Sequence, residues 1–194
     1  MIIAIDPGIT NCGINLSTKV KDKLKILKTI NIAGSRKLRE QDEIDAAEAY
    51  GERTGKLLRI ASAVKDLILE NPQVNMIVLE APFINMRRPL AFASLLEVLH
   101  TIKYTVALPN QLKICVVEPK LVKKVFAGNG NAGKDMMREA MEEHVSKGKV
   151  ILKGFTIEDL SEHEVDAGAV AYTFYFDAPD VKKVTTKNKK KKRG

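Results

Sequence analysis

The sequence contains no tryptophan, only two cysteines, and no acidic residue after Asp180. Both cysteines, Cys12 and Cys115, lie in apolar runs, where a free thiol acts as a small buried hydrophobe. Two isolated cysteines offer neither a disulfide framework nor the spacing of a cysteine metal site, which suits a reducing compartment. We therefore expect a cytoplasmic protein.

Targeting and membrane-spanning signals are also missing. The N-terminus has no basic segment, and Asp6 interrupts its apolar run, so a signal peptide is not expected. The longest mostly apolar stretch, residues 89–108, contains Glu97, His100 and Lys103. Such a stretch favours a buried helix over a membrane span, and we expect no membrane partner.

Positive charge is concentrated at the C-terminus. Residues 182–194, KKVTTKNKKKKRG, contain seven lysines and one arginine and account for the whole net charge of +8. The composition predicts one domain over residues 1–181 and a disordered basic tail over 182–194. The tail would attract nucleic-acid phosphate regardless of sequence, through Lys189, Lys190, Lys191, Lys192 and Arg193. The alternatives are a solubilising tail or, more weakly, a nuclear-import signal.

Apolar runs and periodicity predict an α/β fold in which a mixed five-stranded sheet is flanked by helices. We expect strands at 1–6, 12–18, 24–33, 75–80 and 113–119, and helices at 45–70, 89–107, 120–127, 133–147 and 161–176. The first three strands should form an antiparallel meander and the later two should be added as parallel crossovers. For residues 34–50 the polar sequence gives the least secure prediction.

Two predicted strands end in a carboxylate, Asp6 in IIAIDPG and Glu80 in NMIVLE. On neighbouring parallel strands the two side chains would lie about 5–10 Å apart, since strands are spaced at about 4.8 Å. Such carboxylates repel and favour a cation between them, and their oxygen atoms suit Mg²⁺ or Mn²⁺. The alternatives are a turn-forming aspartate before Pro-Gly, or a core acid held in a salt bridge.

A second polar group lies in the segment LSEHEVDAGAVAYTF, residues 160–174. His163 and Asp166 are three residues apart, so they share one face at the start of a predicted helix. The small residues that follow would let this helix lie close to the sheet. Glu162 and Glu164 are interpreted as acids placed at a helix N-terminus, where the helix dipole favours them.

A glycine-rich turn, GNGNAGK, joins two predicted helices within residues 120–137. Such turns can present backbone N–H groups to phosphate. The spacing of a Walker A loop is not met, because Asp135 follows Lys134 where that loop has Ser or Thr.

Taken in order, four motifs resemble the RuvC family of Holliday junction resolvases, within the RNase H-like superfamily. They are IIAIDPG, VLEAPF, EPKLVKKVFAGNGNAGK and HEVDA. The resemblance runs from residue 2 to about 175, with gaps near 34–50 and 148–160. It implies an RNase H-like fold and a metal-dependent endodeoxyribonuclease.

The resemblance also implies residue roles. Two divalent ions, Mg²⁺ or Mn²⁺, would be held by Asp6, Glu80, His163 and Asp166. Lys123 and Lys134 would contact the scissile region, with Lys134 catalytic, and Phe83 would wedge into the junction core. Phe83 could instead be a core residue. Much of the family has a carboxylate in place of His163. An imidazole ligand shifts the metal preference toward Mn²⁺, so we expect Mn²⁺ to support activity at least as well as Mg²⁺. Because histidine must be neutral to bind a metal, we also expect activity to fall toward pH 6.

The expected function is the resolution of four-way DNA junctions by paired symmetric nicks. A homodimer would supply two matched sites, with the helix at 89–107 as its interface through Leu90, Phe92, Leu95, Leu96, Leu99 and Ile102, unless this helix is simply a core element. The alternatives are an RNase H-like nuclease for other branched DNA or RNA–DNA hybrids, a non-catalytic junction-binding protein, and an actin-like ATPase. An actin-like ATPase fold requires a second phosphate loop, and this sequence contains none.

Overall fold

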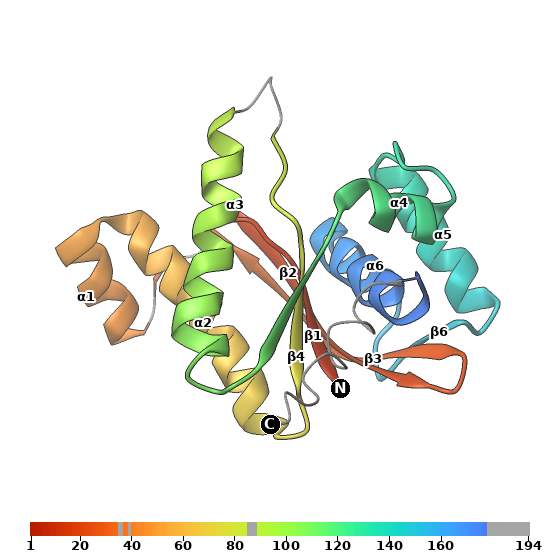
Figure 1. The fold of residues 1–194 in the computed structure, drawn as a ribbon, viewed down its shortest axis with the longest axis horizontal. Helices are drawn as coiled ribbons and strands as arrows, with labels where there is room; N and C mark the ends of the chain where they lie inside the picture. The colour runs from red at the N-terminus through yellow and green to blue at the C-terminus, as the bar shows by residue number, and fades with distance from the viewer. Residues whose placement is uncertain (35–36, 39, 85–88, 178–194) are drawn as a thin grey trace, which may run out of the picture.

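A twisted mixed sheet with helices on both faces forms the centre of the molecule (Figure 1). The computed structural model describes residues 1–34, 37–38, 40–84 and 89–177. The sheet has six strands in the order β5-β4-β1-β2-β3-β6. The strands are β1 (Ile2–Asp6), β2 (Asn11–Val20), β3 (Lys23–Ala33), β4 (Met76–Glu80), β5 (Lys113–Val117) and β6 (Val150–Leu152).

The strand directions confirm the predicted meander and crossovers. β1, β2 and β3 pair antiparallel, whereas β4 pairs parallel with β1, and β5 pairs parallel with β4. The predicted strand count of five is wrong, because β6 adds a sixth strand parallel to β3. β6 has only three residues and is flanked by Gly148 and Gly154, so it is too short to show a strand periodicity in the sequence.

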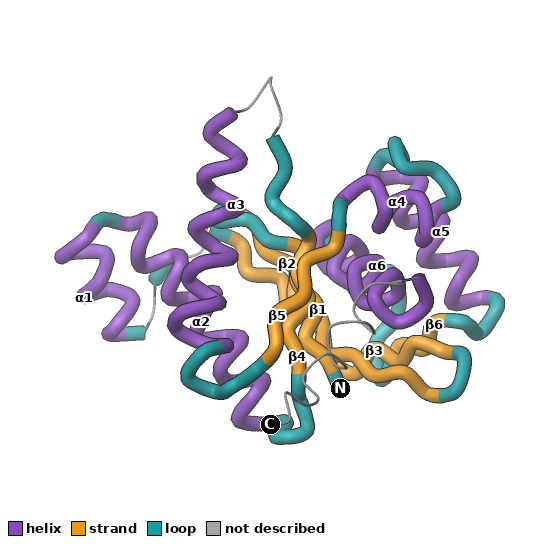
Figure 2. The backbone as a smooth tube through the Cα atoms, in the orientation of Figure 1, coloured by secondary structure: helices purple, strands orange, loops and turns teal. Residues whose placement is uncertain are grey.

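One face of the sheet, called here the apolar face, is covered by α2 and α3 (Figure 2). The predicted helix at 45–70 is instead two helices, α1 (Gln41–Tyr50) and α2 (Glu52–Glu70). They are separated by Gly51, whose φ of 92° lies outside the helical region. α1 packs against α2, and an ion pair between the partly buried Arg59 and the buried Glu43 joins them.

The apolar helix predicted at 89–107 begins at Pro89 as expected. It forms α3 (Pro89–Ile102) and continues as a π-helical turn, η1 (Lys103–Ala107). The stretch Leu90–Ala107 is long and apolar enough to cross a membrane. This is weak evidence for a membrane span, because core helices meet the same criterion. Val98, Ile102 and Val106 are fully buried in the core beneath the apolar face, so this stretch packs on the sheet.

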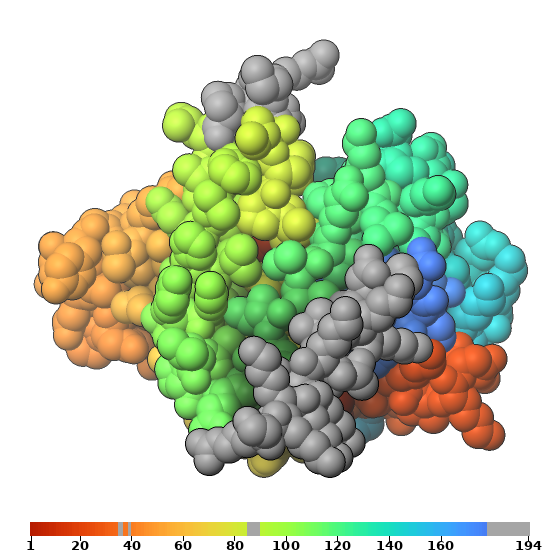
Figure 3. Space-filling model, in the orientation of Figure 1, coloured from red at the N-terminus to blue at the C-terminus, as the bar shows by residue number. Residues whose placement is uncertain are grey.

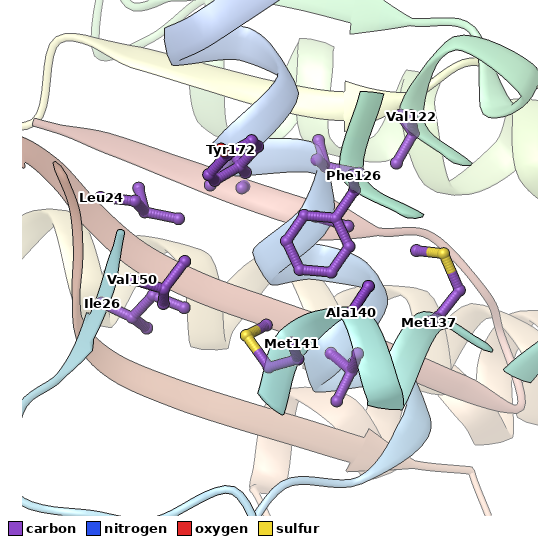
Figure 4. Packing of buried hydrophobic residues seen from close by; sticks show 14 of the residues in the cluster. Leu24, Ile26, Val122, Phe126, Met137, Ala140, Met141, Val150 and Tyr172 are labelled. Carbon is purple, nitrogen blue, oxygen red and sulfur yellow. The ribbon is translucent and has the colours of Figure 1, made fainter. Parts of the chain in front are cut away.

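The other face of the sheet, called here the polar face, is covered by α6 (Glu162–Asp177). α4 (Pro119–Ala127) and α5 (Lys134–Ser146) pack around α6. Figure 4 shows Phe126 of α4, Met141 of α5 and Tyr172 of α6 within one cluster. In the space-filling view, α3 and the α4–α5 pair lie on opposite sides of the molecule (Figure 3). The predicted basic tail, residues 182–194, lies outside the described residues.

Alternation along β1 divides the two cores. Ile3 and Ile5 are fully buried against the apolar face, whereas Ile2 and Ala4 belong to the cluster beneath α6. Successive side chains in a strand point to opposite faces, so Asp6 lies on the same face as Ala4, toward α6. The fold therefore directs the carboxylate at the end of β1 to the polar face.

Candidate active site

Asp6 and Glu80 lie at the carboxyl ends of adjacent parallel strands. The register pairs Ile5 of β1 with Leu79 of β4, so the next residue along each strand is an acid. In each strand the residues just before the acid are buried, 2–5 in β1 and 77–79 in β4, whereas the acidic last residue is partly accessible. This arrangement confirms that the two carboxylates are neighbours on a rigid element.

The start of α6 is fixed by a capping box, in which Ser161 and Glu164 bond reciprocally. The Ser161 backbone N–H donates to Glu164 Oε2 at 2.8 Å, and the Glu164 backbone N–H donates to Ser161 Oγ at 3.3 Å. β2 and β3 hold the same turn, since Asn15 Nδ2 donates to the Glu164 carbonyl and Thr29 Oγ1 donates to Glu164 Oε1. Glu164 is thus an acid at the helix N-terminus, as predicted, and it also caps the helix, which was not predicted. This capped turn fixes the start of the helix that carries His163 and Asp166.

Glycines let α6 approach the sheet closely. A Cβ atom at Gly13 of β2 would lie 1.9 Å from the His163 carbonyl oxygen, so no other residue fits there without displacing the helix. Gly13 is the partner of Asp6 in the β1–β2 register. Within α6, a Cβ at Gly168 would meet Met141 Cε at 2.7 Å. The predicted close packing of the small-residue helix is confirmed.

His163 reaches Asp6 directly. Its Nδ1 lies 2.7 Å from Asp6 Oδ2, and the two side chains are 32% and 15% exposed. The hydrogen bond to Asp6 raises the pKa of His163, because the carboxylate stabilises the protonated ring. The structure therefore brings the first motif, IIAIDPG, into contact with the last, HEVDA.

The remaining carboxylates are partly desolvated and repel each other. Burial, together with the charges of Asp6 and Asp166, raises the pKa of Glu80 to about 8. Burial and the charge of Asp6 raise the pKa of Asp166 to about 6. The Lys123 ammonium acts in the opposite direction on both groups. Asp6, Glu80, Asp166 and Lys123 thus share one electrostatic site.

These side chains fit divalent cations by their chemistry. Asp6, Glu80 and Asp166 supply the hard oxygen ligands that Mg²⁺ and Mn²⁺ bind, and His163 adds a nitrogen ligand. The charge of Asp6 contributes to the raised pKa of both Glu80 and Asp166. Across the described residues, no three His, Cys, Asp or Glu side chains converge in a geometry that would hold a metal ion. His163 instead bonds to Asp6. The four-residue metal site stays a prediction.

The two predicted lysines occupy different positions. Lys123 of α4 lies near enough to Glu80 and Asp166 for its charge to lower the pKa of both carboxylates. Lys134, at the first residue of α5, forms an ion pair with Glu162. Glu162 was expected to be only a helix-terminal acid, and the sequence gives no signal for this pairing.

Phe83 is 46% exposed in the segment that follows β4, which excludes its alternative interpretation as a core residue. The structure also identifies positioning residues that the sequence reading missed, namely Gly13, Asn15, Thr29 and Ser161. Only Ser161 had a recognisable signal, the S-x-x-E spacing of a capping box.

No protein-family model and no curated protein matches the sequence. Solved structures do match. Thermus thermophilus RuvC in complex with a Holliday junction substrate superimposes with a TM-score of 0.65 at 20% identity, covering 90% of this chain and 92% of that one. The yeast mitochondrial Holliday junction resolvase gives a TM-score of 0.61 at 11% identity, covering 88% and 75%.

A third match is the manganese-soaked nuclease domain of human cytomegalovirus terminase, with a TM-score of 0.52 at 10% identity, covering 91% of this chain and 83% of that domain. Identities this low establish the fold and not the activity. The chain therefore has the RNase H-like fold of the RuvC Holliday junction resolvases, as its four sequence motifs indicated.

Proposed function

We propose that this protein is a metal-dependent endonuclease that resolves four-way DNA junctions by paired symmetric nicks. One observation carries the proposal. Asp6, Glu80, Asp166 and His163 lie near one end of the sheet, where burial and the charge of Asp6 raise the pKa of both Glu80 and Asp166. Structural proteins rarely gather such charges at a partly open site, whereas phosphodiester hydrolysis uses them.

In this proposal Asp6, Glu80, Asp166 and His163 would hold two divalent cations, Mg²⁺ or Mn²⁺, which supply a Lewis acid and an activated water when bound. The chain's own contribution is placement. β1 and β4 fix two of the acids on buried strands, and the capped start of α6 fixes the other two groups. Lys123 and Lys134 would offset negative charge on the scissile phosphate.

Branched DNA would be recognised by groups around this end of the sheet. Phe83, exposed after β4, would insert as an apolar wedge between bases at the crossover. The basic tail would add sequence-independent attraction to phosphate. Phe83→Ala should then reduce junction distortion without affecting the fold.

Paired nicks require two sites, which a two-fold symmetric dimer would supply. α3 is the proposed interface, because Leu90 is 82% exposed and Phe92, Leu95, Leu96 and Leu99 are only partly buried. Ile102, which was expected to belong to this interface, is fully buried in the core. A monomer at micromolar concentration in sedimentation analysis would contradict the dimer.

The test uses a labelled synthetic four-way junction and a linear duplex with the same arm sequence, in Mg²⁺ and in Mn²⁺. Asp6→Asn removes one predicted ligand, and Asp22→Asn, in the exposed β2–β3 turn, is the matched control. We expect symmetric nicks in the junction only, abolished by Asp6→Asn and retained by Asp22→Asn. Binding without cutting in either metal would indicate a junction-binding module.

A second candidate is a nuclease with a broader substrate range, including other branched DNA and RNA–DNA hybrids. The similarity to the terminase nuclease domain supports this second candidate, because a similar fold occurs there in a nuclease that is not named a resolvase. Equal cutting of the linear duplex, or cutting of a hybrid alone, would support this candidate over junction resolution.

A further inference from the structure

Lys134 and Glu162 link the first turns of two different helices. Lys134 begins α5, Glu162 begins α6, and the Lys134 Nζ atom bonds to Glu162 Oε2 across 28 residues of sequence. The two side chains, together with Asp166, line one small pocket. The ion pair therefore borders the candidate active site.

The pair is held electrostatically and not by burial. The two side chains are 69% and 49% exposed, and an exposed ion pair is weak and readily exchanged for another partner. Glu162 and Asp166 both raise the pKa of Lys134, while Glu162 in turn raises the pKa of Asp166. Lys134 is thus a fully charged cation whose nearest anion lies at the edge of the site.

We propose that Glu162 is a positioning residue that holds Lys134 in the free protein at the place where a DNA phosphate takes over on binding. The Glu162 carboxylate and a phosphodiester offer the same acceptor oxygens to an ammonium group. The exchange keeps Lys134 extended beside Asp166, and a phosphate must displace an internal anion to reach it. This inference rests on the proposed nuclease function and identifies a residue that tunes its DNA affinity.

The exchange has two measurable consequences. Removing Glu162 leaves Lys134 available without competition, so junction binding should tighten about two- to fivefold, the range expected for one exposed ion pair. The salt dependence should change as well. A lysine already neutralised by Glu162 releases fewer counterions when it meets a phosphate, so the slope of log K against log salt should steepen by about one without Glu162.

The experiment measures junction binding in EDTA over a salt series, so that cutting does not consume the DNA. Glu162→Gln is compared with Glu143→Gln, which removes the acid of another exposed ion pair, Glu143–Lys147 on α5. We expect tighter binding and a steeper slope for Glu162→Gln only. In a Lys134→Gln background, Glu162→Gln should leave the slope unchanged, because the competed cation is gone.

A second measurement does not involve DNA. Glu162 raises the pKa of Lys134, so acylation of this lysine by a limiting amine reagent near pH 9 should be faster in Glu162→Gln than in the wild type or in Glu143→Gln. Peptide mass spectrometry reads the rate at Lys134. An unchanged rate would show that the two side chains do not pair in solution, and the inference would be wrong.

The outcomes separate the inference from the proposed function. If the wild type cuts junctions and Glu162→Gln binds with the same affinity and slope as Glu143→Gln, only the inference fails. If the wild type neither binds nor cuts junction DNA, the proposed function and the inference fail together. Weaker binding by Glu162→Gln would also overturn the inference, because Glu162 would then assist binding.

Discussion

The two faces of the sheet have the same strands and different contents. Beneath the apolar face, β1, α2 and α3 share a buried hydrophobic cluster, and the buried carboxylate on this side, Glu43, lies outside that cluster between α1 and α2. Beneath the polar face, buried Asn15, Ser17 and Glu164 accompany the hydrophobic cluster, and Asp6 lies at its border. Both faces pack a hydrophobic core that stabilises the fold, and the polar face in addition orients chemical groups.

The comparison shows how a strand can serve both purposes. Ile5 and Asp6 are adjacent in sequence and point to opposite faces, so one residue packs a core and the next enters the candidate site. Hydrogen bonds offset part of the cost of burying polar groups on the second face, as between Asn15 Nδ2 and the Glu164 carbonyl at 2.9 Å. Among the described residues, Asn15 Oδ1 and Ser17 Oγ are buried there without a hydrogen-bond partner.

The largest expected effect separates these two neighbours. Asp6→Asn should lower junction cleavage by about a hundredfold or more, as the loss of one preorganised charged group does elsewhere, while the free energy of unfolding stays nearly constant. Ile5→Ala should lower the free energy of unfolding by about 2–5 kcal/mol and leave cleavage per folded molecule intact. Urea unfolding and junction cleavage are the two measurements. If both variants lost activity equally, the division between the faces would be wrong.

A smaller effect concerns pH. The pKa of Glu80 is about 8 in the folded protein against an unperturbed 4.5, so the folded state binds more protons than the unfolded state between these values. The free energy of unfolding should therefore fall as pH rises from about 5 to 8 in EDTA, by a few kcal/mol at about 1.4 kcal/mol per pKa unit.

Glu80→Gln tests this pH dependence, because it removes the titrating group and should flatten the decline. Thermal or urea unfolding at several pH values provides the measurement. Mn²⁺ or Mg²⁺ should raise stability most at the alkaline end, where the carboxylates are charged. A profile for Glu80→Gln identical to that of the wild type would contradict the desolvated acid on the polar face.

The smallest effect concerns the start of α6. Ser161→Ala removes the capping hydroxyl and should lower the free energy of unfolding by about 0.5–2 kcal/mol. Ser146→Ala, at the exposed end of α5, is the control and should change it by less than about 0.5 kcal/mol. Because Ser161 orients the turn that carries His163, cleavage by Ser161→Ala should also fall, whereas Ser146→Ala should retain it.

Much of the fold could be predicted from short-range patterns. Five of the strands follow from apolar runs, and Pro89 and the glycines near 128–133 correctly mark helix boundaries. β6 escaped detection because three residues carry no period. The break between α1 and α2 was missed because the helical pattern continues on both sides of Gly51, and a single glycine does not by itself end a predicted helix.

The candidate site was predicted less completely. Its acids stand out because a carboxylate at the end of a buried strand is unusual. Gly13 and Asn15 do not stand out, since their role depends on what packs against them, and the partner of Lys134 lies on another helix.

By itself, the sequence determined the order of five strands and of most helices along the chain, and it placed Asp6 and Glu80 at strand ends and His163 and Asp166 near the start of a helix. These features depend on local periodicity and caps. Only the tertiary structure decided the strand order β5-β4-β1-β2-β3-β6, the contact between His163 and Asp6 across 157 residues, and the pairing of Lys134 with Glu162. The reason is physical: these contacts depend on which faces of distant elements pack together, and a local sequence pattern does not specify the residues on the opposing element.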